Sequence, residues 1–529
     1  MGPSAIVRDC PLLWGCLRTP VWAVLASGFL ILSAVGLYGA VAAVNPAAEV
    51  RAAITDVVEL RSRIEARIRD PKFQGARWGI QVWALDAQAA VFEHASEQVL
   101  VPASNTKLFT AALALDRLGP DFRIRTSVLA SRSLGRSGRV EGGLALVGRG
   151  DPGFGAGTKN LSLLGEQLAA RGLRSVSGDV LADARFFNGS LFGSGWMVED
   201  LDAYYSPEVS ALSYNDNVAD WVVVAGAKVR DSARLFLVQP ESGLVLSNFV
   251  LTAEVAAKPT LDARRFLGRN EGMAWGEIPL GGAPLTNTLT VHDPAAWCAR
   301  ALIADLKQRD IRWRSGQVKT LNSWGGGAPL GPDLSAWQEL AFVESAPLSE
   351  LVREMMKPSN NLHAQLLFLQ VGAREGESVP FQTTEVRAVG AMRRFLRPIV
   401  KGGRLPILEE GSGLSRRHGV SASQIVDLLT HMHGHASARA FRDALPIAGV
   451  DGTLRTRMRG TAAYGNVRAK TGTLRGVNTL SGYLTTAGGE SWAFSILLND
   501  YQAAPGQRPA REEVDAVAVL LAEFAGRLQ

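Results

Sequence analysis

The segment Ser104-Asn105-Thr106-Lys107 places a hydroxyl group and an amine three residues apart, at the start of a predicted helix that runs from about Ser104 to Leu118. Side chains three residues apart lie on the same face of a helix, so these two can touch. A serine hydroxyl is a poor nucleophile until a base removes its proton. A partly buried Lys with a lowered pKa can be that base, whereas Arg cannot. Only ten of the 56 basic residues are Lys, and Lys107 alone among them follows a Ser by three positions. The pattern therefore predicts an activated serine.

By itself, such a pattern is more often a helix-capping Ser followed by an exposed Lys. Two further segments favour the catalytic interpretation. Ser359-Asn360-Asn361 lies within a helical stretch just after Lys357, and Lys470-Thr471-Gly472 is the only K-T-G in the chain. Ser359 follows Ser104 by 255 residues and Lys470 follows Ser359 by 111, which leaves room for an inserted unit between the first two motifs. A second S-x-N, Ser213-Tyr214-Asn215, competes for the role, and we favour Ser359 because it lies near Lys357 in a helical segment.

The helices and strands expected around these motifs indicate one α/β unit. The two ends of the chain form this unit, and an inserted unit splits it. Between about 121 and 290, short strands separated by Gly, Ser and Asn predict that the insert is β-rich. We place the split unit at 46–119 and 334–529, and the insert at 120–333. Outside the β-rich stretch, the predicted elements are a helix at 49–69, a hairpin at Gly79–Leu85 and Ala89–Glu93, helices at Pro294–Gln308 and Leu348–Val371, strands at Arg468–Lys470, Val477–Thr485 and Trp492–Leu498, and a closing helix from about Arg511 to Leu528.

The N-terminus carries an apolar run that predicts a membrane segment. Val21 to Val44 contains 24 residues without a charge, preceded by Arg8 and Arg18. At 1.5 Å per residue a helix of this length reaches roughly 36 Å, enough to cross a bilayer core of about 30 Å. Positive charge before the run predicts that residues 1–20 are cytoplasmic and that 21–44 is a transmembrane anchor, with the remainder exported. The small residues Ala40 to Ala43 leave open that the segment is a cleaved signal instead.

Composition excludes several classes of function. A chain of 529 residues that is 47% hydrophobic can fill a core, and a net charge of +6 without a basic tail gives no support for nucleic-acid binding. Three Cys provide neither a disulfide framework nor a Cys-based zinc site, and His431, His433 and His435 lack a nearby carboxylate pair, so no metal site is predicted. Gly148 to Gly153 fits G-x-G-x-x-G, but its surroundings do not fit a nucleotide fold, and we expect no cofactor.

In order and spacing, the S-x-x-K, S-x-N and K-T-G motifs resemble those that line one cleft in the penicillin-recognising serine enzymes. The long insertion narrows the resemblance to the D-alanyl-D-alanine carboxypeptidase/endopeptidase family, the class C low-molecular-mass penicillin-binding proteins. The resemblance covers roughly residues 50 to 525, and departs from the pattern at Glu410, where we expect Asp, and at Gln365, where we expect an acid. Three further phrases resemble the family: Gly150-Asp151-Pro152, Glu410-Gly411-Ser412-Gly413-Leu414-Ser415-Arg416 and Ala448-Gly449-Val450-Asp451-Gly452-Thr453-Leu454.

The resemblance implies an α+β fold: a serine β-lactamase/transpeptidase-like domain, with an antiparallel sheet flanked by helices and a long β-rich insertion. It also implies a serine DD-peptidase of the bacterial cell wall that binds peptidoglycan stem peptides and is acylated by β-lactams, at the periplasmic or extracytoplasmic face of the inner membrane. The implied roles are nucleophile for Ser104, general base for Lys107, proton relay for Ser359, substrate binding for Asn361, Lys470, Thr471, Gly472 and Thr473, and an oxyanion hole made by the backbone N–H groups of Ser104 and Thr473.

Alternatives remain open at this point. A β-lactamase would need fast deacylation by a positioned water, and the sequence assigns no acid to that task. A non-hydrolytic β-lactam sensor or wall-binding protein would have no need of an activated nucleophile. The balance between carboxypeptidase and endopeptidase action also stays open. A further hypothesis is that Glu199 or Asp200, in the insert, binds a free ammonium group of the substrate.

Overall fold

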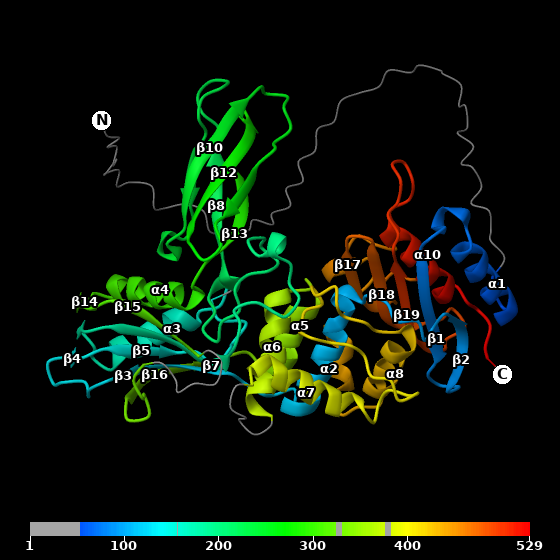
Figure 1. Cartoon of the computed structure of the whole chain (residues 1–529), viewed down its shortest axis with the longest axis horizontal. Helices are drawn as coiled ribbons and strands as arrows, with labels where there is room; N and C mark the ends of the chain where they lie inside the picture. The colour runs from blue at the N-terminus through cyan, green and yellow to red at the C-terminus, as the bar shows by residue number, and fades with distance from the viewer. Residues whose placement is uncertain (1–52, 156, 324–330, 376–381, 529) are drawn as a thin grey trace, which may run out of the picture. The chain divides into compact units, whose positions relative to one another are not determined.

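The chain divides into two units, Met1–Ala52 and Ala53–Gln529. The computed structural model describes residues 53–155, 157–323, 331–375 and 382–528 (Figure 1). The predicted cytoplasmic segment 1–20 and the predicted membrane segment 21–44 lie outside these residues. Within the described ranges, none of the helices combines the length and the apolar character needed to cross a bilayer.

A five-stranded antiparallel sheet forms the centre of the split unit, in the order β17-β18-β19-β1-β2. It brings the predicted hairpin near the start of the chain beside the three strands predicted near its end, as expected. The middle strands are buried along almost their whole length, because helices cover both faces of the sheet. The bounds are β1 Arg77–Ala84, β2 Ala89–His94, β17 Arg468–Leu474, β18 Val477–Thr485 and β19 Ser491–Asn499.

Helices from both ends of the chain cover this sheet (Figure 1). On one face lie α10, Ala510–Ala522, and α1, Val57–Ile68, which packs on α10. A bridge between Ile54 and Phe524 joins the two ends. The other face carries α8, Ala422–His433, with α2, Thr106–Leu118, packed next to it. The remaining helices of this side are α5 Leu348–Met356, α6 Asn361–Arg374, α7 Thr384–Leu396 and α9 Ala438–Ala444.

The single helix predicted from Leu348 to Val371 is wrong, because the structure breaks it into α5 and α6. Pro358 has no N–H with which to continue the helical ladder. Ser359 then takes a left-handed conformation with φ of +67°, and Asn360 caps α6 by accepting the N–H of His363. The S-x-N serine consequently lies in a tight turn between two helices and not within one.

The insert contains a mixed five-stranded sheet in the order β15-β7-β5-β3-β16. Strand β16, Gln338–Glu344, pairs with β3, Arg125–Ala130, so the inserted sheet extends past our predicted boundary at 334. Two helices, α3 Asn160–Ala170 and α4 Pro294–Gln308, pack with this sheet and a smaller one ordered β14-β6-β4. The other strands are β4 Arg139–Glu141, β5 Leu144–Val147, β6 Ser175–Ser177, β7 Val180–Asn188, β14 Arg312–Ser315 and β15 Val318–Ser323.

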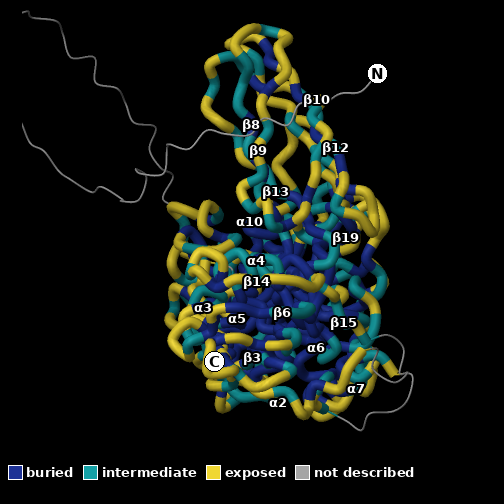
Figure 2. Tube along the Cα trace, turned by 90° about the vertical axis from the view of Figure 1, so that its left-hand side faces the viewer, coloured by how far each residue is buried: buried dark blue, intermediate teal, exposed yellow. Residues whose placement is uncertain are grey.

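Two three-stranded sheets, β13-β8-β9 and β10-β12-β11, enclose a small core of their own within the insert. Strands β10 and β12 are mostly exposed or half-buried along their length (Figure 2). The bounds are β8 Val218–Val224, β9 Arg234–Leu237, β10 Val245–Ala253, β11 Asp262–Arg265, β12 Glu271–Pro279 and β13 Leu285–Thr290.

Candidate active site

Ser104 lies on a single turn of 3-10 helix, η2 Ala103–Asn105, which leads directly into α2. One turn later, the Nζ atom of Lys107 lies 3.1 Å from the Ser104 Oγ atom. Ser104 is half-buried, whereas Lys107 is completely buried. The structure therefore brings the predicted hydroxyl and amine into hydrogen-bond contact.

Lys107 has two further partners, both of them acceptors. Its Nζ atom donates to the Asn361 Oδ1 atom at 2.6 Å and to the main-chain carbonyl of Ser412 at 2.6 Å. Burial lowers the pKa of Lys107 to about 7, and the negative charge of Glu410 acts in the opposite direction. A lysine with such a pKa is partly neutral near neutral pH, which is the state that a base requires.

The S-x-N and K-T-G motifs meet through Lys470, whose Nζ atom donates to the Ser359 Oγ atom at 2.8 Å and to the carbonyl of Thr471 at 2.9 Å. Lys470 is completely buried. Burial, reinforced by the charges of Lys107 and Arg457, lowers its pKa well below the ordinary value. The left-handed turn at Ser359 aims this hydroxyl at the strand that carries Lys470.

The glycine of K-T-G allows strand β17 to lie directly against the turn that carries Ser104. A Cβ atom at Gly472 would lie 2.2 Å from Thr479 Oγ1, 2.7 Å from the carbonyl oxygen of Pro102 and 3.1 Å from the backbone nitrogen of Ser104. Real Cβ atoms do not approach a main-chain oxygen so closely, so only Gly fits at this position. Three segments that lie far apart in the sequence thus line one site.

Known proteins are similar to this chain over most of its length. A model of the D-Ala-D-Ala carboxypeptidase 3 (S13) family matches residues 60–523. The chain belongs to this family. The match confirms the resemblance inferred from the three motifs and makes the protein a member of a peptidase family.

Individual relatives of this S13 member point the same way. It is 37% identical over 484 residues to the D-alanyl-D-alanine carboxypeptidase of Actinomadura sp. (strain R39), covering 89% of this chain and 86% of that protein. The crystal structure of penicillin binding protein 4 (dacB) from Haemophilus influenzae is similar, with a TM-score of 0.72, 25% identity and coverage of 88% of this chain and 99% of that one. A second structure of the Haemophilus protein, complexed with a β-lactam, shares the fold with a TM-score of 0.67 and 24% identity, over 86% of this chain and 96% of that one.

In this S13 peptidase the motifs open onto a cleft of about 1220 Å³. Ser104, Ser359 and Asn361 line it together with Thr471 and Thr473, while the two lysines lie beneath its surface. Residues of the insert form part of the wall, and they include the two acids that the sequence singled out: Glu199, Asp200, Tyr204, Tyr205 and Asp216.

Several contacts of the site could not be found from motifs. The carbonyl of Tyr205, in the insert, accepts the Nδ2 group of Asn361 at 2.8 Å, so both ends of that amide have partners. Thr453 Oγ1 lies 2.8 Å from Thr471 Oγ1. Thr453 belongs to the segment Ala448-Gly449-Val450-Asp451-Gly452-Thr453-Leu454, which resembles the family.

A residue of the same segment also holds the S-x-N turn. Asp451 accepts the Nζ group of Lys357 at 2.6 Å, and Lys357 donates in addition to the carbonyl of Leu445 at 2.7 Å. The backbone carbonyl of Lys357 accepts the N–H of Thr453 at 3.0 Å. The lysine that precedes Ser359 therefore ties the turn to the loop that contacts Thr471.

The competing S-x-N is not part of the cleft. The Ser213 side chain is buried and donates to the carbonyl of Ser210 at 2.9 Å. Asp216, three residues later, does reach the cleft wall, where it contacts His363 at 2.8 Å and Asn360 at 3.3 Å. This segment of the insert thus packs against the start of α6.

Proposed function

We propose that this S13 peptidase is a serine DD-peptidase that hydrolyses the D-Ala-D-Ala bond, or D-Ala-containing crosslinks, of peptidoglycan through an acyl-enzyme on Ser104. The hydrogen bonds of Lys107 carry the proposal. A neutral amine has two N–H groups and one lone pair. The Asn361 Oδ1 atom and the Ser412 carbonyl can only accept, so they take the two N–H groups. The lone pair then faces the third partner, the Ser104 hydroxyl.

Acylation would follow from this arrangement. Ser104 Oγ attacks the carbonyl carbon of the D-Ala residue as its proton passes to Lys107 Nζ. Backbone N–H groups of Ser104 and Thr473 bind the oxygen that becomes negative, an interaction that contributes about 3 to 4 kcal/mol in enzymes of this kind. The C–N bond breaks and the leaving amine receives a proton relayed by Ser359. Water then attacks the ester and releases the enzyme.

Lys470, Thr471 and Thr473 would bind the terminal carboxylate of the substrate. Lys470 is already held by Ser359 Oγ, so a carboxylate at the cleft surface meets a positioned donor. Asn361 would hold the substrate amide. To do so, its Nδ2 group would exchange the carbonyl of Tyr205 for that of the peptide.

β-Lactams would acylate Ser104 in the same pocket, because their carbonyl and carboxylate groups resemble those of the peptide. A β-lactamase is a second candidate, and so is a sensor without turnover. Membership of the D-Ala-D-Ala carboxypeptidase 3 (S13) family favours a peptidase over these two alternatives. An N-terminal anchor that exports residues 45–529 would place the cleft where peptidoglycan lies.

The assignment of the nucleophile is tested by Ser104→Ala in the purified full-length protein. We expect the wild type to gain the mass of one penicillin molecule on the peptide that contains Ser104, and the variant to gain none while it still unfolds at the wild-type temperature. A penicilloyl adduct on the variant would show that another residue is the nucleophile.

The reaction is tested with purified muropeptides, crosslinked and not, followed by mass spectrometry. Released D-alanine identifies a carboxypeptidase, and split dimers identify an endopeptidase. Intact muropeptides together with a persistent penicilloyl adduct would identify a sensor. Rapid hydrolysis of penicillin without action on muropeptides would identify a β-lactamase.

A further inference from the structure

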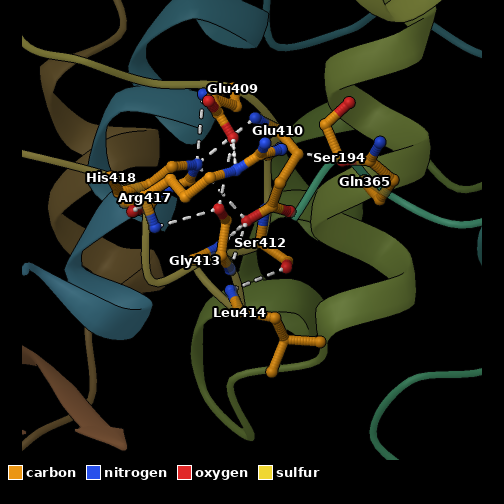
Figure 3. A network of polar contacts seen from close by, with 12 residues as sticks. Ser194, Gln365, Glu409, Glu410, Ser412, Gly413, Leu414, Arg417 and His418 are labelled. Atoms are coloured by element: carbon orange, nitrogen blue, oxygen red, sulfur yellow. Dashed lines mark hydrogen bonds and ion pairs between the residues drawn. The ribbon is translucent and has the colours of Figure 1, made fainter. Parts of the chain in front are cut away.

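A buried carboxylate, that of Glu410, lies two residues before Ser412, whose carbonyl contacts the proposed base Lys107. Glu410 is 1% exposed. Its carboxylate accepts the backbone N–H groups of Ser412 and Gly413, each at 2.6 Å, and that of Ser415 at 3.4 Å (Figure 3). These three bonds curl the loop around the carboxylate and fix its backbone.

Ser412 is held at both ends by this arrangement. Its N–H donates to Glu410, and its carbonyl accepts Lys107 Nζ at 2.6 Å. The position of that carbonyl decides which directions are left to the lone pair of Lys107. If the loop moved, the lone pair would no longer be fixed on the Ser104 hydroxyl.

The preceding residue is anchored as well. The N–H of Gly411 donates to Gln365 Oε1 at 2.8 Å, and its carbonyl accepts the hydroxyl of Thr110 at 2.7 Å. Gln365 Nε2 in turn donates to Glu385 Oε1 at 2.7 Å. Here the departure at Gln365 has a physical reason, because an amide can accept from Gly411 and donate to Glu385, whereas an ionised carboxylate could not donate.

His418 faces Glu410 but does not neutralise it. Its Nε2 atom accepts the backbone N–H groups of Glu409 at 3.1 Å and of Glu410 at 3.3 Å, so its proton lies on Nδ1, which contacts Thr106 Oγ1 at 3.0 Å. Burial lowers the pKa of His418 against the opposing charge of Glu410, which keeps the ring neutral.

Three other charged groups lie near Glu410: one is paired with another residue, one is a second carboxyl, and one is Lys107 itself. Glu409 pairs with Arg417 at 2.8 Å. Glu385, on α7, is a carboxyl whose own pKa is raised by burial. Lys107, on α2, is the amine that Glu410 faces through Ser412, and the charge of Glu410 favours its protonated form. Burial by itself raises the pKa of Glu410, but the hydrogen bonds that its carboxylate accepts from Ser412 and Gly413 act against burial, and the pKa of Glu410 is lowered overall, so the carboxyl is ionised.

We infer that Glu410 is a positioning residue for the reaction: its carboxylate holds the Ser412 carbonyl against Lys107, and its negative charge sets how readily Lys107 gives up its proton. The inference rests on the proposed function, in which Lys107 is the base. A structural role alone would make Glu410 matter for stability and rate, whereas the charge adds an effect on the pH dependence.

The sign of that effect follows from the charges. A negative charge favours the charged form of a nearby amine, so Glu410 holds the pKa of Lys107 above the value that burial alone would give. Without this charge, Lys107 becomes neutral at a lower pH. It is then also a weaker base, so the maximal rate of acylation falls.

Three variants of the full-length protein test the inference: Glu410→Gln, Glu410→Asp and the control Glu409→Gln. The measurement is the second-order rate of acylation by a fluorescent penicillin over a pH range that brackets about 7. The acid limb is the part of the profile in which the acylation rate rises with pH. For E410Q we expect this limb to move to lower pH by on the order of one unit, and the maximal rate at high pH to be lower. For E410D, which keeps the charge, the limb stays in place with a reduced rate. E409Q removes an adjacent charge paired with Arg417 and leaves the profile unchanged.

An E410Q protein that is folded and slower, but whose acid limb coincides with that of the wild type, overturns the inference. E410D gives a second route to refutation, because it keeps the charge: a shifted limb in this variant contradicts the inference. These outcomes are separate from failure of the proposed function. In that case the wild type itself shows no adduct on Ser104, whereas here the adduct forms on Ser104 and only the pH dependence fails to move.

Discussion

Replacing Gly472 by Ala tests whether the close contact between β17 and the turn that carries Ser104 controls the proposed reaction. The added Cβ atom would lie 2.7 Å from the carbonyl oxygen of Pro102, which no side-chain rotation can relieve. Ordinary contact begins at 3.4 Å, so the strand and the turn must separate by roughly 0.7 Å. The same atom displaces Thr479 Oγ1, which donates to that carbonyl at 3.0 Å.

A displacement close to 1 Å between the nucleophile and the groups that bind the substrate costs about 100-fold in rate. We therefore expect Gly472→Ala to lower the acylation rate by on the order of 100-fold, with a loss of stability of about 1 to 3 kcal/mol from overpacking. Stopped-flow acylation by a fluorescent penicillin gives the rate, and urea unfolding gives the stability.

Gly390→Ala is the matched control. Gly390 lies inside α7, and its added Cβ atom would meet only the tip of Arg394, at 3.4 Å. Ala is the better helix former by about 1 kcal/mol, so this variant should be slightly more stable and acylate at the wild-type rate. A folded G472A protein that acylates within about threefold of the wild type would refute the argument that this approach positions Ser104.

Two further predictions concern the base and the cleft wall. Acylation of the wild type should rise with pH through about 7, because Lys107 must lose its proton to accept that of the serine; a rate independent of pH between about 6 and about 9 would contradict the assignment of the base. Glu199→Gln combined with Asp200→Asn should raise KM roughly tenfold for a stem peptide with a free side-chain ammonium and leave an N-acetylated peptide unaffected, and an equal loss for both peptides would exclude a charge contact.

The contacts among the three motifs were predictable because their geometry is local or their residue types are distinctive. Ser104 and Lys107 meet since one helical turn separates them, and this distance is fixed by the backbone. Lys470 could be assigned because lysine is rare in this chain and K-T-G occurs once. The central sheet followed from strands with continuous apolar stretches near both ends of the chain.

The turn at Ser359 was missed because the apolar residues of α5 and α6 continue a helical spacing across it. Pro358 was the available signal. A proline in the interior of a helical pattern ends the helix or kinks it, and here the chain reverses into a left-handed residue. The consequence is functional, since a continuous helix would not direct the Ser359 hydroxyl to Lys470.

Long-range pairing explains the other differences. Nothing in residues 334–344 indicates that β16 pairs with β3, more than 200 residues earlier, so the sequence did not predict that the sheet of the insert extends past 333. The carbonyl groups of Tyr205 and Ser412 are main-chain atoms, which a motif cannot reveal. Both of them complete the hydrogen bonding of predicted side chains.

The two buried lysines differ in whether a negative charge lies near their ammonium group, and the proposed reaction depends on that difference. Lys107 faces the charge of Glu410 through Ser412, whereas the groups that act on Lys470 in the described part of the chain are burial and other cations. A buried cation without an anion is unstable, so Lys470 disfavours its charged form until a carboxylate arrives. A substrate carboxylate would supply that anion and raise the pKa of Lys470. Because the resulting pair is neutral overall, it adds little field at Lys107, which can stay neutral and accept the proton of Ser104.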